Sequence, residues 1–501
     1  MNVNADQPKS AGDYVVSKVV PANPVEPNLR DGQMFRESLR DGRVVILDGK
    51  EVGDVTEAPT LARGIDTIAS YYDAQFDPAT RDEVTTVDPD TGERYSNAWL
   101  IPRSKQDLLA HERAIRLSTS QSFGVFGRPP DYGATKAISF VAWNHLISKG
   151  DKDALGKVEN FIRVGRRNNL MSADIVADVQ ANRKLVPEQM KGRLRVIEER
   201  KDGVVLHGAK AAASNLAQGN IGTISMPPPA QNPPEDSMIW AALPANAPGL
   251  RYLLREQLTT GFENADDHPI DSLGEESDCT LVFDNVFVPN DYVFSYKNAA
   301  TVGSYNTLGQ FAFWKIANRL SYRAEIFAGA AQMIVDALGT DHIPAVRQMV
   351  AEVVQYSAIL RGMMASAVEN CSMTESGVML PHHGYVTAGR LFSIEHYPRI
   401  MQTLRDLSGQ GLIGRVPRKT WERADVQGML DEYLPGYRMN AWEKNKLFNL
   451  VWDMTCSPHA MRVALFENIN ATPAPALREE LYRSFDRSRG LQLISRRLGL
   501  D

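Results

Sequence analysis

The chain has 501 residues with 55 basic and 61 acidic side chains, so its formal net charge at pH 7 is −6. Because charges of both signs are mixed along the chain, the sequence argues against a nucleic-acid partner. No long apolar run and no signal-peptide pattern occur, so neither a membrane span nor secretion is expected. The cysteines, Cys279, Cys371 and Cys456, lie far apart, which favours a reducing, cytoplasmic compartment over a disulfide framework.

The N-terminal third of the chain is predicted to be mainly helical. Its first residues are polar and contain prolines, and we expect a loosely held arm there. A short helix and then two apolar runs, split by the Asp-Gly pair at 48–49, predict a β-hairpin. From 104 to about 165 the spacing is helical apart from GRPPDY at 127–132, whose prolines prevent helix continuation. We place this first domain at residues 1–167.

The middle of the chain, residues 168–300, is predicted to be a β domain. Short β-prone runs lie between 194 and 296: LRVIEE, GVVLHG, IGTISM, MIWAAL and CTLVFDNVFV. The proline-rich segment 227–237 is expected to be a loop at the edge of this domain. Long helical patterns follow and predict a helix bundle over 301–501. This order of helices, strands and helices indicates an α+β fold.

The familiar chemical motifs are missing from the sequence. There is no GxGxxG after a strand and no GxxxxGK[ST], so any nucleotide cofactor must be held by scattered side chains. His382 and His383 are adjacent and point apart, and no metal site is predicted. Without a GxSxG elbow, a hydrolase is disfavoured. Taken alone, GRPPDY is interpreted as a turn in which Asp131 caps the next helix.

Several segments, spread over nearly the whole chain, match one family in its order. They are SLRDGRVVILDGKEVGDVTEAP at 38–59, SFGVFGRPPDY at 122–132, GVVLHGAKAAASN at 203–215, LVFDNVFVP at 281–289 and WDMTCSPHAMRVALFE at 452–467. The chain thereby resembles the large component of the FADH2-dependent 4-hydroxyphenylacetate 3-monooxygenase family. The resemblance implies an acyl-CoA dehydrogenase-like fold, with an N-terminal helical domain, a middle β-barrel and a C-terminal helical bundle, assembled as a homotetramer.

The activity that this resemblance implies is that of the oxygenase component of a two-component flavin monooxygenase. FAD, as FADH2, would come from a separate NAD(P)H:flavin reductase, and molecular oxygen would be the co-substrate. An electron-rich aromatic substrate, a phenol or an N-heteroaromatic, would be hydroxylated through a C4a-hydroperoxyflavin. One alternative is the family's CoA-thioester dehydratase and isomerase branch, although no cysteine precedes Cys279 to bind its iron–sulfur cluster. Another is a flavin-binding structural tetramer without hydroxylase activity.

The resemblance also assigns roles to individual residues. Arg128 and Tyr132 match the family's substrate contacts beside the flavin. A guanidinium offers fixed donors to a phenolate or carboxylate, and a phenol can donate to an oxygen near the peroxide. Ser214 matches a small hydroxyl near the flavin N5. The predicted catalytic residues are Arg128, Tyr132, Asp174 and Ser214. The predicted flavin contacts are Asp174, Ile175, Val176, Arg183, Ser214, Asn215, Gln410, Gly411, Cys456, Ser457, His459 and Arg462.

Near the C-terminus the chain departs from the family pattern GSxFGxR. Cys456, His459 and Ala460 replace the family's Gly, Phe and Gly, whereas Ser457 and Arg462 match. Flavin contact is still expected from this segment.

A second departure lies at 171–183, where the family reads like YxxHAIxNPxxDR and uses the histidine on the phenolic oxygen. Here Asp174 stands in its place, or Ala173 under a one-residue shift. An ionised aspartate repels a phenolate and prefers an N–H, ammonium or neutral hydroxyl donor. The sequence therefore favours a substrate other than a simple phenol. Alternatively, Asp174 turns away and pairs with Arg183 or caps a neighbouring backbone.

Overall fold

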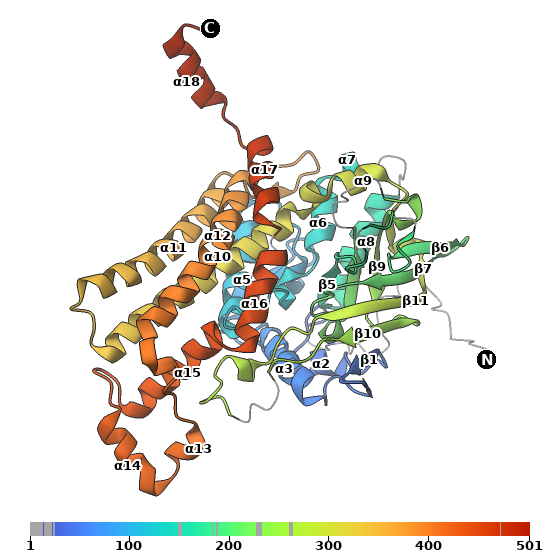
Figure 1. Ribbon diagram of the computed structural model, residues 1–501. Coiled ribbons are helices and arrows are strands. Elements are labelled where there is room, and N and C mark those ends of the chain that lie inside the picture. Colours follow the sequence, from blue (N-terminus) through green and yellow to red (C-terminus); the bar gives the residue numbers. More distant parts are fainter. Residues whose placement is uncertain are drawn as a thin grey trace.

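The computed structural model describes residues 14, 23, 26–148, 153–182, 184–186, 189–226, 233–259, 264–470 and 472–500. Along the chain, an N-terminal helical part is followed by two β-sheets and then by a C-terminal helical bundle (Figure 1). The sheets and the bundle lie on opposite sides of the molecule. Among the described residues, no helix is both long and apolar enough to cross a membrane.

The N-terminal part contains the predicted helix and hairpin. Asp48 and Gly49 both have positive φ, 50° and 74°, which gives the tight turn between the first two strands. The first strand also pairs in parallel with a strand of the middle region, so this hairpin extends the larger sheet. The helices are α2 (Gly32–Glu37), α3 (Pro59–Asp73), α4 (Arg81–Val84), α5 (Lys105–Gln121), α6 (Thr135–Ala142), α7 (Asn144–Ile147) and α8 (Ala154–Arg167).

Two sheets form the β layer. The larger has the order β2-β1-β10-β11-β7-β6, and the smaller has the order β12-β9-β8-β5. Their strands are β1 (Val44–Leu47), β2 (Lys50–Val52), β5 (Ser172–Ile175), β6 (Arg195–Glu199), β7 (Gly203–Lys210), β8 (Ile221–Ile224), β9 (Ile239–Pro244), β10 (Leu250–Leu254), β11 (Cys279–Pro289) and β12 (Val293–Tyr296). A small separate ribbon joins β3 (Thr85–Val87) to β4 (Arg94–Ser96). The β-prone runs all become strands, but β5, β10 and β12 were not predicted.

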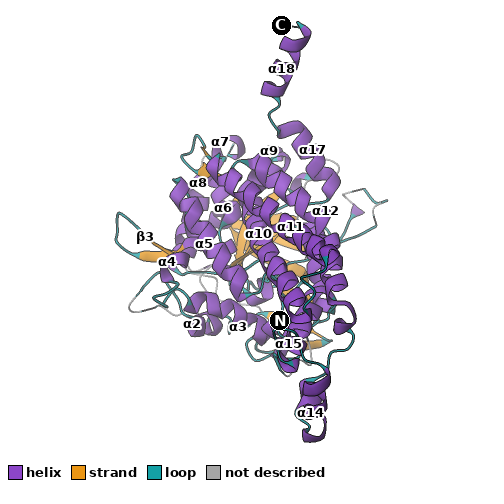
Figure 2. Cartoon of the chain, turned by 90° about the vertical axis from the view of Figure 1, so that its left-hand side faces the viewer, coloured by secondary structure: helices purple, strands orange, loops and turns teal. Residues whose placement is uncertain are grey.

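Long helices build the C-terminal bundle, as expected. The helix α10 is capped at its C-terminal end by Gly339, whose φ of 65° favours glycine. The helices are α9 (Ala299–Gly303), α10 (Tyr305–Leu338), α11 (Pro344–Glu369), α12 (His383–Ser408), α13 (Arg418–Trp421), α14 (Ala424–Tyr433), α15 (Ala441–Thr455), α16 (Pro458–Asn470), α17 (Ala474–Ser484) and α18 (Ser488–Leu498). A short ribbon, β13 (Ser372–Met373) with β14 (Met379–Leu380), follows α11. Figure 2 shows α10, α11 and α12 across one face, with α18 projecting from the body.

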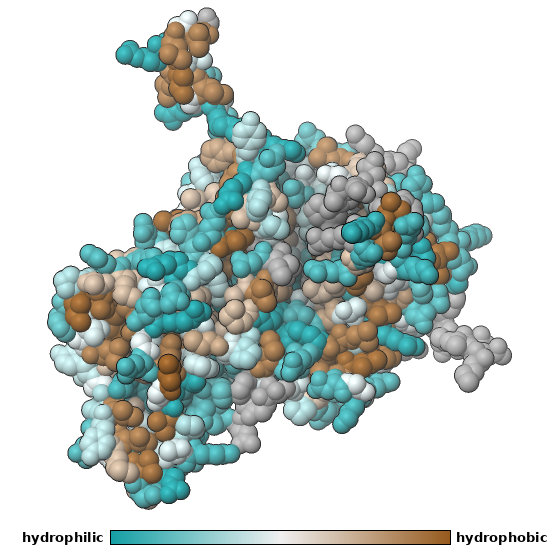
Figure 3. Space-filling model, viewed as in Figure 1, coloured by the Kyte–Doolittle hydropathy of each residue, from teal (hydrophilic) through white to brown (hydrophobic). Residues whose placement is uncertain are grey.

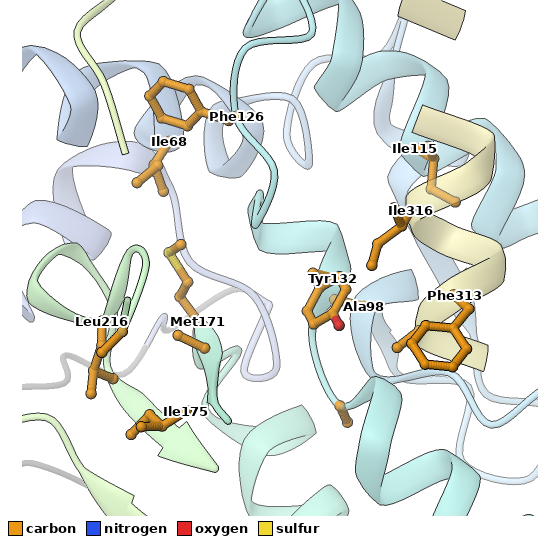
Figure 4. Packing of buried hydrophobic residues seen from close by; sticks show 14 of the residues in the cluster. Ile68, Ala98, Ile115, Phe126, Tyr132, Met171, Ile175, Leu216, Phe313 and Ile316 are labelled. Carbon is orange, nitrogen blue, oxygen red and sulfur yellow. The ribbon is translucent and has the colours of Figure 1, made fainter. Parts of the chain in front are cut away.

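One large hydrophobic core joins the three parts of the chain. Tyr132, from the N-terminal part, lies near Phe313 and Ile316 of α10, and Ile175 of β5 and Leu216 belong to the same cluster on the side of the β layer (Figure 4). These side chains are buried. Because the junction is apolar, polar groups that are buried there need specific partners.

Candidate functional site

The segment GRPPDY forms a buried 3-10 turn, η2 (Pro130–Tyr132), between α5 and α6. The expectation that Asp131 caps the next helix is wrong, because its side chain accepts a hydrogen bond from the Ser118 hydroxyl and α6 has no side-chain cap. The Lys315 ammonium donates to the backbone oxygen of Asp131, and burial lowers the pKa of this lysine to about 8. The turn is therefore anchored to α5 on one side and to α10 on the other.

Arg128 and Tyr132 lie together at this turn. The guanidinium carbon of Arg128 is 4.7 Å from the centre of the Tyr132 ring and 5.4 Å from that of Phe466, which is cation–π geometry. Asn215 donates to the backbone oxygen of Arg128 at 2.8 Å, and the Arg128 N–H donates to Glu276. Burial lowers the pKa of Arg128, but Tyr132 and Glu276 outweigh it and the pKa is raised. Burial raises the pKa of Tyr132, so its phenol remains a donor.

Two carboxylates, Glu276 and Asp278, link this turn to the helix α16 of the C-terminal bundle. Arg462 donates to Asp278 at 2.6 and 2.7 Å and to Glu276 at 3.1 Å. Ser214 donates to the same Asp278 at 2.6 Å. Burial alone would raise the pKa of Asp278, but Arg462 lowers it to about 2. Arg128, Ser214, Asn215 and Arg462, predicted from distant segments, are thus brought together.

Asp174 lies on β5 beside the same region. Its Oδ1 accepts a hydrogen bond from the Thr223 hydroxyl, and its Oδ2 is 3.9 Å from Nζ of Lys136 on α6. Both members of this ion pair are buried. The next residue, Ile175, is buried in the core, and the backbone oxygen of Val176 accepts from a neighbouring lysine at 3.0 Å. Asp174 is therefore paired within the structure, and its partner is a lysine.

Ser457 and His459 lie in a second polar cluster near the end of α15. His459 Nδ1 is 3.1 Å from an oxygen of Asp271, and the Ser457 hydroxyl is 3.4 Å from the same oxygen. Burial lowers the pKa of His459 to about 4, whereas burial and Asp453 raise that of Asp271 to about 8. His268, Asp271 and Asp453 also place metal-ligand atoms within 4.8 Å of one another, although no metal site was predicted. Asp453 accepts hydrogen bonds from the backbone N–H groups of Ile270 and Asp271. Its carboxylate therefore holds this loop in place.

The other predicted flavin contacts lie apart from these clusters. Gln410 is exposed on η8 (Gly409–Leu412), and Gly411 packs so closely on Phe448 that a Cβ atom would come 2.7 Å from its ring. Cys456 caps the end of α15 and is half-buried. Arg183 lies outside the described residues. The roles of these residues stay predictions.

The sequence did not identify Lys136, Glu276 and Asp278 as site residues. Of these three residues, Lys136 was the easiest to recognise from the sequence, because it is the one charged residue in the apolar helical run KAISFVAW. No sequence feature marked Glu276 and Asp278 as site residues, because the acidic run EESD is typical of a solvated turn. Arg128 and Arg462, which bind these carboxylates, are 148 or more positions away along the chain, so only the fold reveals the cluster.

Comparisons with known proteins show which family the chain is similar to. Models of the N-terminal and C-terminal parts of 4-hydroxyphenylacetate 3-hydroxylase match residues 31–295 and 302–499. The 4-hydroxyphenylacetate 3-monooxygenase oxygenase component of Thermus thermophilus is 28% identical over 88% of this chain and 91% of its own length. The oxygenase component of 4-nitrophenol 4-monooxygenase/4-nitrocatechol 2-monooxygenase from Rhodococcus opacus is 29% identical over 89% of this chain and 86% of its own length.

Solved structures place the chain in a fold class. The oxygenase component of 4-hydroxyphenylacetate 3-monooxygenase, complexed with FAD and 4-hydroxyphenylacetate, matches with a TM-score of 0.87 and 27% identity over 94% of this chain and 98% of that one. A 4-hydroxybutyryl-CoA dehydratase from N. maritimus matches at 0.83 with 18% identity, over 94% and 95%, and shows the fold alone. The expected acyl-CoA dehydrogenase-like fold is confirmed. Within it, the chain belongs to the 4-hydroxyphenylacetate 3-hydroxylase family.

Proposed function

We propose that the chain is the oxygenase component of a two-component, FADH2-dependent aromatic monooxygenase. The observation that carries this proposal is the buried cluster of Arg128, Tyr132, Ser214 and Arg462, in a chain matched over nearly its whole length by the family models. When bound, reduced flavin activates molecular oxygen for transfer to an electron-rich ring. A separate reductase would supply it, and the free cysteines fit a cytoplasmic location.

The residues present suit a flavin beside this cluster. Among the described residues, the buried atoms Asn215 Oδ1 and His459 Nε2 have no hydrogen-bond partner, although buried polar atoms normally have one. Asn215, Ser457, His459 and Arg462 would hold the cofactor, and Ser214 offers a hydroxyl already oriented by Asp278. Arg128 and Tyr132 would orient the aromatic ring, and their burial excludes water from the reacting atoms.

Turnover with a defined source of reduced flavin tests the proposal. The purified chain is mixed with FAD, a chemical reductant or a flavin reductase, oxygen and a panel of phenols and N-heteroaromatics. A hydroxylated product is expected only when reduced flavin is supplied, because the sequence has no nicotinamide-binding fingerprint. Oxidation of NADH by the isolated chain at a catalytic rate, or no product from any aromatic, would contradict the proposal.

We also propose that the chain works as a homotetramer. The helix α18 projects from the body and carries an apolar face (Figure 3), with Leu491, Ile494 and Leu498 each about three-fifths exposed. An exposed apolar helix face of this kind is normally buried against a partner, and another copy of the chain can serve as that partner. Light scattering should give a tetramer for the natural chain and a smaller assembly for Ile494→Glu. An unchanged mass for that variant, or a natural monomer, would oppose this proposal.

A further inference from the structure

A compact group of metal-ligand side chains lies between the loop that joins β10 to β11 and the helix α15. His268 comes from this loop, Asp271 begins its 3-10 turn η6 (Asp271–Leu273), and Asp453 lies on α15. Each side chain offers one ligand atom, and the three atoms lie within 4.8 Å of one another. The side chains of Asp271 and Asp453 are fully buried. Two carboxylates that are 182 positions apart in the sequence therefore meet at one buried point.

In both carboxylates, one oxygen is bonded within the protein and the other is not. Asp453 Oδ2 accepts the backbone N–H groups of Ile270 and Asp271 at 3.0 and 3.1 Å. Asp271 Oδ1 lies 3.1 Å from Nδ1 of His459. The remaining oxygens, Asp453 Oδ1 and Asp271 Oδ2, are buried and have no hydrogen-bond partner within the described part of the chain. Because buried carboxylate oxygens are costly without a partner, these two require a positively charged one.

Two nearby cations have other partners. Arg255 donates to Glu275, in the same loop, at 2.5 Å. Arg415 interacts with the charge of Asp453, but its guanidinium donates to a backbone oxygen at 2.9 Å. Burial and Asp453 raise the pKa of Asp271 to about 8, since two negative charges are costly at this place. A cation between the two carboxylates would remove this cost.

The spacing and the donor atoms fit a divalent transition-metal ion. Two ligands that each lie about 2.1 Å from one ion in tetrahedral geometry are about 3.4 Å apart. Nδ1 of His268 lies 3.5 Å from Asp453 Oδ1, and the remaining separations, all within 4.8 Å, close to this value by small side-chain rotations. One imidazole nitrogen with two carboxylate oxygens suits Zn²⁺ or Mn²⁺ better than Ca²⁺, which takes oxygen ligands. An iron–sulfur cluster does not fit, because it is held mainly by thiolates.

The groups around the three ligands are those that a metal site needs. In metal sites the ligating carboxylates are themselves hydrogen-bonded, and here backbone N–H groups hold Asp453 while His459 holds Asp271. The Ser457 hydroxyl lies 3.4 Å from the same oxygen of Asp271. The side chain of His268 is 31% exposed, so an ion has a path from solvent to the buried carboxylates.

We infer that His268, Asp271 and Asp453 bind one divalent transition-metal ion, a site that goes beyond the proposed flavin chemistry. Asp271 and Asp453 each bind the ion through the oxygen that has no partner in the protein, and any proton on Asp271 is released to solvent. The ion ties the β10–β11 loop to α15 and holds Asp271 where it contacts His459. It therefore stabilises the folded chain.

Binding of Zn²⁺ to the flavin-free chain tests this site apart from any turnover. The chain is stripped of metals with a chelator, dialysed and titrated in a calorimeter. One ion should bind at this site, and Asp271→Asn and Asp453→Asn should each weaken its binding at least about tenfold. Each asparagine keeps the oxygen that is hydrogen-bonded in the natural chain and replaces the ligand oxygen by an amide N–H group.

Asp266→Asn is the matched control for this titration, because it removes a partly exposed carboxylate from the same loop. It should bind Zn²⁺ as the natural chain does. Equal affinity and stoichiometry in the natural chain and all three variants would overturn the site, since the ion would then be bound elsewhere. Failure of the natural chain to bind Zn²⁺ would overturn it as well.

Thermal unfolding checks that the variants are folded. In chelator, Asp271→Asn and Asp453→Asn should melt no lower than the natural chain, because each removes one of two buried like charges. Zn²⁺ at about 100 times its dissociation constant should raise the melting temperature of the natural chain and of Asp266→Asn by about 3 °C. The rise in the two ligand variants should be at most about half as large. An equal rise in all four proteins would overturn the site.

Co²⁺ tests the ligand atoms on the natural chain, without any variant. Bound by one nitrogen and carboxylate oxygens, Co²⁺ should absorb visible light but lack the strong ultraviolet band of a cobalt–thiolate bond. Zn²⁺ should displace it and abolish the absorption. A cobalt–thiolate band would overturn the assigned ligands, because it would require a cysteine such as Cys456 in place of one of them.

Discussion

Glu276→Gln tests whether the carboxylate between the GRPPDY turn and α16 fixes the site. The side chain of Glu276 is fully buried, accepts the backbone N–H of Arg128 and accepts from Arg462 at 3.1 Å. Unit charges at about 4 Å interact by about 4 kcal/mol at an effective dielectric of 20. However, Arg462 keeps Asp278, and a glutamine oxygen can still accept from Arg128. The loss should therefore be that of one charge-assisted hydrogen bond, about 1.5–3 kcal/mol.

Urea unfolding measures this loss, and the exposed ion pair of Glu199 with Lys297 provides the control. Glu199→Gln makes the same chemical change at the surface, where solvent screens the charges, and should cost nothing measurable. Glu276→Gln should also lower the amount of product per FADH2 consumed, because Arg128 loses part of its anchor. If the two variants are equally stable and equally coupled, Glu276 does not position the turn.

Two further predictions follow from the site. In Arg128→Ala, flavin oxidation should continue but yield hydrogen peroxide in place of product, because the substrate ring is no longer oriented. An unchanged yield of product per FADH2 would show that Arg128 does not bind the substrate. Burial lowers the pKa of His459 from 6.5 to about 4, so its contribution to stability is present above pH 6.5 and is lost as the pH falls toward 4. Between pH 7 and 5 the natural chain should therefore lose about 2 kcal/mol more than His459→Gln does, as measured by urea unfolding, and parallel pH profiles would show that His459 is not buried as a neutral group.

Much of the fold could be predicted because its elements are specified locally. The Asp-Gly turn at 48–49 and the apolar alternation of β11 are signals within a few residues, and both were found. The strand β5 was missed because Ser172 and Asp174 are uncommon in strands. Its position is set by parallel pairing with β8, 49 positions away, which no local pattern reveals.

The candidate site could be predicted only in part. Arg128, Ser214 and Arg462 were found through the family resemblance, and the structure brings them together. Lys136 was missed, so the cation that lies 3.9 Å from Asp174 was not expected. The net charge of a buried site depends on side chains from several elements, here α6, β5 and η2. It therefore cannot be predicted from one substitution in one segment.

The most direct test of the central claim is the source of the oxygen in the product. The chain is supplied with FADH2 under ¹⁸O2 in ordinary water, with an alkylphenol as the substrate, and the product is analysed by mass spectrometry. A monooxygenase places one atom of molecular oxygen in the ring, so we predict a hydroxylated product carrying one ¹⁸O. A product that carries only oxygen from water, or no hydroxylated product under any supply of FADH2, would contradict the account.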